Sequence, residues 1–128
     1  MTPDAAMQRI NLILAHAWMV RQFLKHADEA QDDAEMLDVH RTIFDYTRGV
    51  EPSLQRGDAA EYVRRARGKL SKLRKAADWF QDNYRRVSDH TNFQMAALSL
   101  KFVVEQIEEV LAQVPKGAVA EGPASETP

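Results

Sequence analysis

The sequence predicts an all-α fold, a single-domain bundle of four helices that run up, down, up and down. Apolar residues recur at spacings of three and four over long stretches, which is the period of an amphipathic helix. Gly and Pro are scarce, five of each among 128 residues, and no Gly or Pro lies between Pro3 and Gly49. The expected helices span about 3–30, 34–48, 59–85 and 91–114, and short links between them favour antiparallel neighbours.

Length and composition exclude several classes of protein. A chain of 128 residues can bury the core of one domain without covalent staples. Cysteine is absent, which excludes disulfides, thiolate metal sites and cysteine nucleophiles. The net charge of −2 gives no overall signal for nucleic acid or membranes. His16 and Arg21 interrupt the first apolar run, so we expect neither a signal peptide nor a membrane span, and a cytoplasmic protein without a cofactor.

The first helix is the packing centre of the predicted bundle. Eleven of the fifteen residues from Ile10 to Leu24 are apolar, and they cover roughly twice the ~100° arc of an ordinary surface helix. Such a helix must lie between neighbours, in its own bundle or against another chain. Pro3 and Asp4 suit its first turn, and the acidic segment 28–33 predicts the turn that follows, with Asp32 or Asp33 capping the next helix.

The second helix is expected to be the shortest. The helix is predicted to end at a C-cap formed by Gly49, and Pro52 is expected to prevent the helix from continuing. Residues 49–57 are then a loop that leaves part of the first helix uncovered.

Capping patterns define the last two helices. Asp58 and Glu61 form a variant of the capping box that begins the third helix, which contains Gly68 at a position of possible close helix approach. Thr91 and Gln94 repeat the pattern before the fourth helix. The bundle is expected to occupy residues 1–114, and the small, polar, Pro- and Gly-rich segment 115–128 is predicted to be a disordered tail.

Excess apolar surface on the first and fourth helices predicts a non-catalytic interaction protein. Met95, Leu98 and Phe102 lie outside the main apolar stripe of the fourth helix. The leading hypothesis is a homodimer, or a complex with another helical protein, in which Trp18, Met19 and Phe102 anchor the interface.

Two histidines fall on predicted apolar faces. His16 lies within the broad arc of the first helix, and His40 lies on the apolar face of the second. Each is expected either to hydrogen-bond a neighbouring tyrosine or to line a small-ligand pocket between helices. Their heights along the bundle differ, so they are not expected to share a ligand.

The third helix carries a dense basic face without an acid among its members, which are Arg64, Arg65, Arg67, Lys69, Lys72, Arg74 and Lys75. Trp79 projects from the side of Lys72 and Lys75. Basic residues beside an exposed aromatic ring are typical of phosphate contact and base stacking. The alternative is a solvated face that pairs with acids of the other helices while Trp79 covers a neighbour.

No metal or nucleophile motif is evident. The chain has no Glu-x-x-His pair of the kind that ferritin-like di-iron bundles use, so no metal site is expected. Arg85 and His90, at Arg-x4-His spacing, are similar to the ribonuclease motif of HEPN domains, which are small and helical. The resemblance covers six residues and the general architecture, and Arg86 stands where the family usually has Asn, Asp or His. It implies that Arg85 stabilises phosphate charge and that His90 is a general acid or base.

Overall fold

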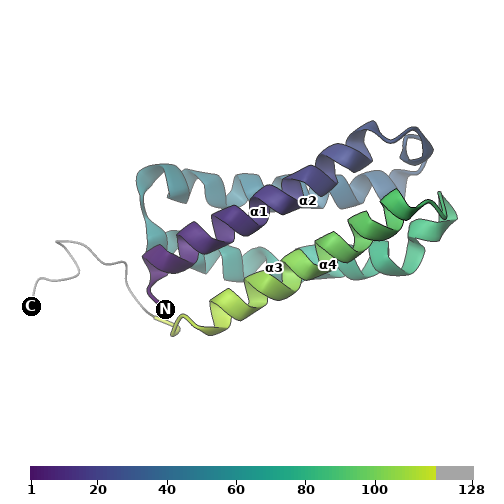
Figure 1. Cartoon of the computed structure of the whole chain (residues 1–128). Coiled ribbons are helices and arrows are strands. Elements are labelled where there is room, and N and C mark those ends of the chain that lie inside the picture. The colour runs from purple at the N-terminus through teal and green to yellow at the C-terminus, as the bar shows by residue number, and fades with distance from the viewer. Residues whose placement is uncertain (118–128) are drawn as a thin grey trace, which may run out of the picture.

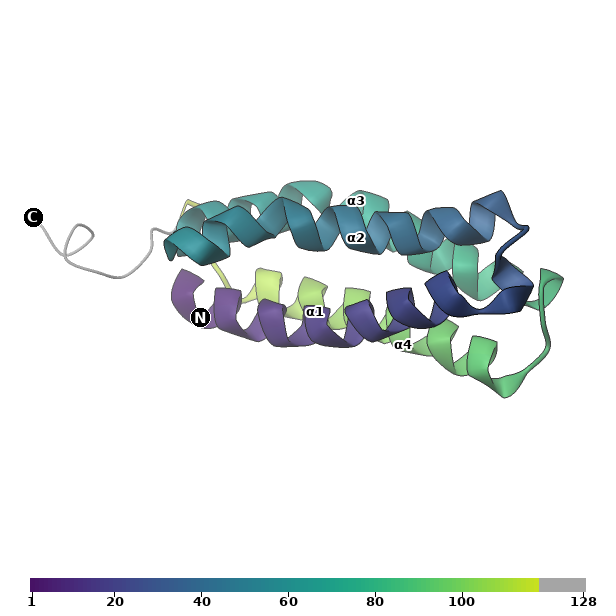
Figure 2. The same ribbon diagram turned by 90° about the horizontal axis from the view of Figure 1, so that it is seen from above.

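The computed structural model describes residues 1–117 and shows four antiparallel helices in two layers. The helices are α1 (Pro3–His26), α2 (Ala34–Arg56), α3 (Ala59–Asn83) and α4 (Thr91–Ala112). Short 3-10 turns, η1 (Asp28–Ala30) and η2 (Tyr84–Arg86), follow α1 and α3. Helices α1 and α4 form one layer, and α2 and α3 form the other (Figures 1 and 2). The predicted four-helix bundle is confirmed. Of the predicted tail, residues 118–128 lie outside the described part.

Side-chain caps fix three helix starts as the sequence indicates. Thr2 lies just before Pro3, and its Oγ1 accepts from the Ala5 N–H at 3.1 Å. Asp33 Oδ1 accepts from the Met36 N–H at 3.0 Å. Asp58 Oδ1 accepts from the Glu61 N–H at 3.1 Å. Each bond satisfies one of the amide donors that a helix start leaves without an intrahelical partner.

Helix α2 is longer than predicted, because it continues through Gly49 and Pro52 to Arg56. Val50 and Ser53 are buried and extend its core face by more than a turn. This packing outweighs the cost of an internal proline, which removes one ladder hydrogen bond. The true C-cap is Gly57, whose φ of 69° lies in the left-handed region. Residues 49–57 are therefore not a loop, and α2 covers α1 along its length.

Other helix ends differ from the prediction by a few residues. α1 ends at His26 rather than at 30, and η1 forms the turn. α3 ends at Asn83, and α4 ends at Ala112. The cap of α4 is His90 rather than Thr91, because its Nδ1 accepts from the Asn92 N–H at 3.0 Å.

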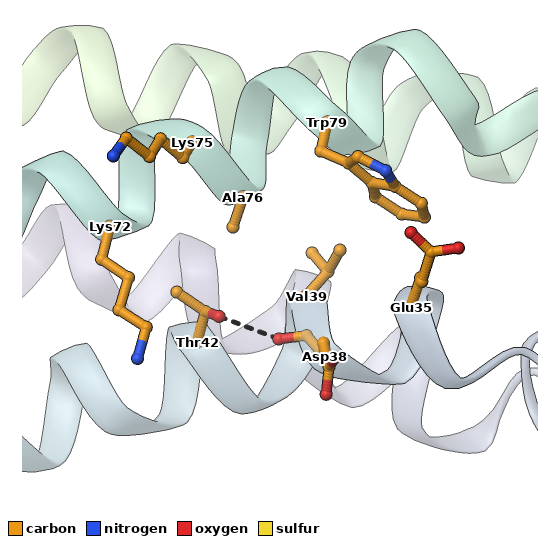
Figure 3. Close-up of a pocket in the computed structure, with 8 residues that line it drawn as sticks. All are labelled: Glu35, Asp38, Val39, Thr42, Lys72, Lys75, Ala76 and Trp79. Atoms are coloured by element: carbon orange, nitrogen blue, oxygen red, sulfur yellow. Dashed lines mark hydrogen bonds between the residues drawn. The ribbon is translucent and has the colours of Figure 1, made fainter.

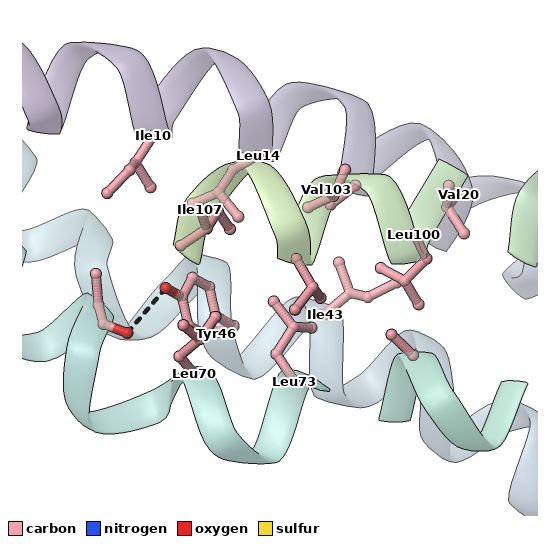
Figure 4. Close-up of a cluster of buried hydrophobic side chains, with 14 of the residues drawn as sticks. Ile10, Leu14, Val20, Ile43, Tyr46, Leu70, Leu73, Leu100, Val103 and Ile107 are labelled. Carbon is pink, nitrogen blue, oxygen red and sulfur yellow. Dashed lines mark hydrogen bonds between the residues drawn. The ribbon is translucent and has the colours of Figure 1, made fainter. Parts of the chain in front are cut away.

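All four helices contribute to one apolar core (Figure 4). The Tyr46 hydroxyl donates to the Ala66 carbonyl at 2.9 Å and links α2 to α3 inside this core. Burial raises the pKa of Tyr46 and that of Tyr62 above the ordinary tyrosine range. Central members of the core from the four helices include Ile10, Leu14, Ile43, Leu70, Leu73, Leu100, Val103 and Ile107.

Candidate functional site

A stripe of exposed apolar residues on α1 borders α4. Leu12 and Met19 are 67% and 66% exposed, and they are seven residues apart, which places them on one side of a helix. Phe23 continues this stripe, and its ring packs edge-on against Phe93 of α4 with centroids 4.9 Å apart. The stripe therefore runs along the outer side of α1, next to the seam with α4.

A matching stripe lies on α4. Met95, Leu98 and Phe102 follow a spacing of three and four, and Phe102 is 61% exposed. Glu108, which pairs with Arg74 of α3 at 3.1 Å, lies on the other flank of α4. The stripe is therefore on the flank away from α3. We call the five exposed side chains together the α1–α4 face: Leu12, Met19, Met95, Leu98 and Phe102.

His16 belongs to this surface and not to the core. It is exposed and lies one turn after Leu12 and one turn before Met19. The prediction that it faces the bundle interior is wrong, since the buried stripe of α1 follows Ile10, Leu14, Ala17 and Leu24 instead. His16 therefore cannot line a pocket between helices with His40.

Trp18 lies on the flank of α1 that faces α2, about 100° around the helix from Met19. Its ring centroid is 6.1 Å from that of Phe44. The guanidinium of Arg21 lies 4.4 Å from the Trp18 centroid and 4.9 Å from that of Phe44. Arg48 lies 5.6 Å from the Trp18 centroid. The structure thus separates Trp18 from Met19 and Phe102, the other two predicted anchors.

His40 is half-buried between α2 and α1. Its Nδ1 is buried without a hydrogen-bond partner, so the expected bond to a tyrosine is not formed. Burial lowers its pKa most, and the charges of Arg21, Arg41 and Lys25 lower the pKa further against an opposing effect of Asp38.

Three of the seven basic residues on the α3 face pair with carboxylates. Arg64 and Arg65 both pair with Glu61, and Arg74 pairs with Glu108. Arg67 donates to the carbonyls of Leu111 and Val114 and so satisfies the end of α4. The alternative interpretation expected pairing with acids of the other helices, and of these contacts only the Arg74–Glu108 pair is of that kind.

Lys72, Lys75 and Trp79 do share a surface, a groove of about 350 Å³ between α2 and α3. Its other wall holds Glu35 and Asp38 (Figure 3). An anion entering this groove would therefore meet carboxylates opposite the lysines, which opposes phosphate binding.

Trp79 is only partly exposed and packs against the core. The guanidinium of Arg86 lies 5.0 Å from its ring centroid and is held there by Asp33 at 2.9 Å and Glu35 at 3.1 Å. The hydrogen bond to Glu35 and the neighbouring charges raise the pKa of Arg86. Arg86 thus occupies one stacking position on Trp79.

Arg85 and His90 are engaged in separate contacts. Arg85 lies over the ring of Tyr84, 5.4 Å from its centroid. The Nδ1 atom of His90 accepts the capping bond from Asn92. Within residues 1–117, no hydrogen bond joins Arg85 to His90. The HEPN resemblance assigns the two residues separate roles, phosphate contact for Arg85 and proton transfer for His90, and these roles stay a prediction.

The described residues contain neither a metal-binding cluster nor a helix that could span a membrane. Among the described residues, no group of three or more His, Asp or Glu side chains is arranged to hold a metal ion. In the same residues, no helix combines the length and apolar character needed to cross a membrane.

Comparison with protein-family models, with curated proteins and with solved structures finds no match to this chain. Its function must therefore be inferred from its own residues.

The sequence interpretation missed Arg21, which is 8% exposed and lies in the buried stripe of α1. A signal was present, because Arg21 lies four residues after Ala17 and three before Leu24. That spacing places a charged side chain among core positions.

Proposed function

We propose that this protein is a non-catalytic helical-bundle protein that self-associates through the α1–α4 face. One observation supports the proposal most directly. Five of the six large apolar side chains that are exposed in residues 1–117 belong to this face, and they come from two adjacent helices. Contiguous apolar surface on a soluble protein commonly marks an interaction site.

The chemistry of the α1–α4 face suits a symmetric homodimer. The span from Leu12 to Met19 contains no Asp, Glu, Lys or Arg, and the span from Met95 to Phe102 contains only the exposed Lys101, so two copies of the face could meet while burying few charges. Each large apolar side chain contributes about 1.5–3 kcal/mol when fully buried. In a two-fold arrangement every such contact occurs twice.

The test is the molar mass of the full chain by light scattering at low and high salt. We expect a dimer at both, because apolar burial is not screened by ions. Met19→Glu and Phe102→Glu should each yield a folded monomer, since a buried carboxylate without a partner is strongly unfavourable.

Ser71→Glu is the matched control, because it adds the same charge at an exposed position of α3. It should remain a dimer. A monomeric parent protein, or Met19→Glu and Phe102→Glu variants that still dimerise, would overturn the proposed interface. If the parent protein is monomeric but binds a different helical protein, and Met19→Glu and Phe102→Glu abolish that binding, the face serves hetero-association instead of self-association.

A further inference from the structure

Arg21 is a buried cation without a carboxylate partner. Only 8% of its surface is exposed, yet within residues 1–117 no Asp or Glu lies within ion-pair distance of it. Burying a charge is costly, and proteins generally compensate for it with an opposite charge. This exception calls for an explanation.

The hydrogen-bonding capacity of Arg21 is also mostly unused. Nη1 donates to Gln22 Oε1 at 3.1 Å, and Nε is buried without any partner. Nη2 is less buried than Nε, and it also makes no hydrogen bond to another protein group among the described residues. A guanidinium presents its donors as a planar fork that matches the two oxygens of a carboxylate.

The surroundings hold the guanidinium in place and keep the local charge positive. The Trp18 and Phe44 rings both face the guanidinium, which limits its movement. Three further cations, Lys25, Arg41 and Arg48, lie on these faces of α1 and α2. Glu51, the carboxylate beside the two rings, is engaged with Arg48 at 2.7 Å, while Asp38 lines the groove between α2 and α3 and is engaged with Arg41 at 3.4 Å.

We infer that Arg21, with Arg48 and the Trp18–Phe44 ring pair, forms a binding site for a single carboxylate on an acidic segment of another protein. Arg21 supplies donors through Nη1 and Nη2, because Nε is buried, and the rings provide apolar surface for the stem of the Asp or Glu side chain. Nucleic acid is disfavoured, because it binds through a run of phosphates, whereas Arg21 offers one guanidinium of which only 8% is exposed. The inference is independent of self-association, since it involves α1 and α2 rather than the α1–α4 face.

Trp18 is a built-in reporter for this site. In a Trp79→Phe background of the full chain, Trp18 is the remaining tryptophan. Hexaglutamate is titrated at constant ionic strength while tryptophan emission is recorded. We expect a saturable change, and at least a tenfold loss of affinity in Arg21→Met. Arg9→Met, which removes an exposed arginine from the same helix, should bind like the parent.

Hexauridylate, with comparable charge, is the phosphate probe and should bind more weakly than hexaglutamate. Arg21→Met should unfold at the same or a higher temperature, because it removes a buried charge that has no counter-ion. If it fails to fold, Arg48→Met, in which a half-exposed side chain is replaced, should weaken binding at least threefold. The inference is overturned by no saturable change, by equal binding of Arg21→Met and its parent, or by tighter binding of hexauridylate.

Discussion

At His40, burial and three neighbouring cations act on one imidazole. Its pKa is lower in the folded chain than the ordinary value of about 6.5 that applies when unfolded, so the unfolded chain binds more protons. The free energy of unfolding is therefore unaffected by this group above about pH 6.5, and it decreases as the pH falls below that value. His40→Gln should reduce the decline in unfolding free energy between pH 7.5 and 5.5, measured by urea denaturation.

The matched control for this experiment is His26→Gln, because His26 is exposed at the end of α1 and is not part of the α1–α4 face. That variant should retain the parent's pH dependence. An unchanged slope in His40→Gln would show that other groups produce the decline.

Two glycines should respond oppositely to the same substitution. Gly68 lies in the interior of α3, and a Cβ there would meet no atom within 4 Å, so Gly68→Ala should stabilise the fold by about 0.5–1 kcal/mol. Gly57 has a φ of 69°, and Gly57→Ala should cost about 1–2 kcal/mol because a Cβ strains the left-handed conformation. Thermal unfolding of both variants tests the pair, and shifts of the same sign would contradict it. The open space around Gly68 also shows that it does not mark a close helix approach.

At the scale of elements, the start of α4 depends on an unusual cap. The His90 imidazole accepts one bond through Nδ1, whereas a carboxylate is a better cap and also interacts favourably with the helix dipole. His90→Asp should therefore raise the unfolding free energy by about 0.5–1 kcal/mol. His90→Ala, which cannot accept the bond, should lower it. Chemical denaturation measures both, and a destabilised His90→Asp would assign the imidazole another structural role.

The elements show why some boundaries were predictable and others were not. Asp33 and Asp58 are local signals, and both cap the helices that the sequence assigns to them. Gly49 and Pro52 are equally clear local signals, but α2 passes through them because Val50 and Ser53 pack against other helices. That energy comes from residues distant in the sequence, which a local pattern does not contain.

At the scale of the whole molecule, the candidate site was predicted in part. Excess apolar surface pointed to Met19 and Phe102, and both are exposed on adjoining helices. Trp18 was assigned to the same surface, although consecutive residues on a helix project about 100° apart. Only packing decides which side of such a broad apolar arc is covered, and here Phe44 covers the Trp18 side. The sequence also could not show that Arg86 would cover Trp79, since Arg86 of η2 is held there by Asp33 and Glu35, which are distant in the sequence.

The seam between α1 and α4 has a consequence for the order in which the bundle assembles. The pairs α1–α2, α2–α3 and α3–α4 are consecutive in the chain, whereas α1 and α4 also pack together although two helices separate them in the sequence. Bringing α1 and α4 together closes the longest loop and so has the largest entropic cost of the helix pairings. We therefore expect this pairing to form late in folding. Leu12 and Met95, 83 positions apart in the numbering, become neighbouring parts of one surface only at that step. A partly folded chain therefore lacks the complete α1–α4 face. If the protein self-associates through this face, only fully folded chains would do so.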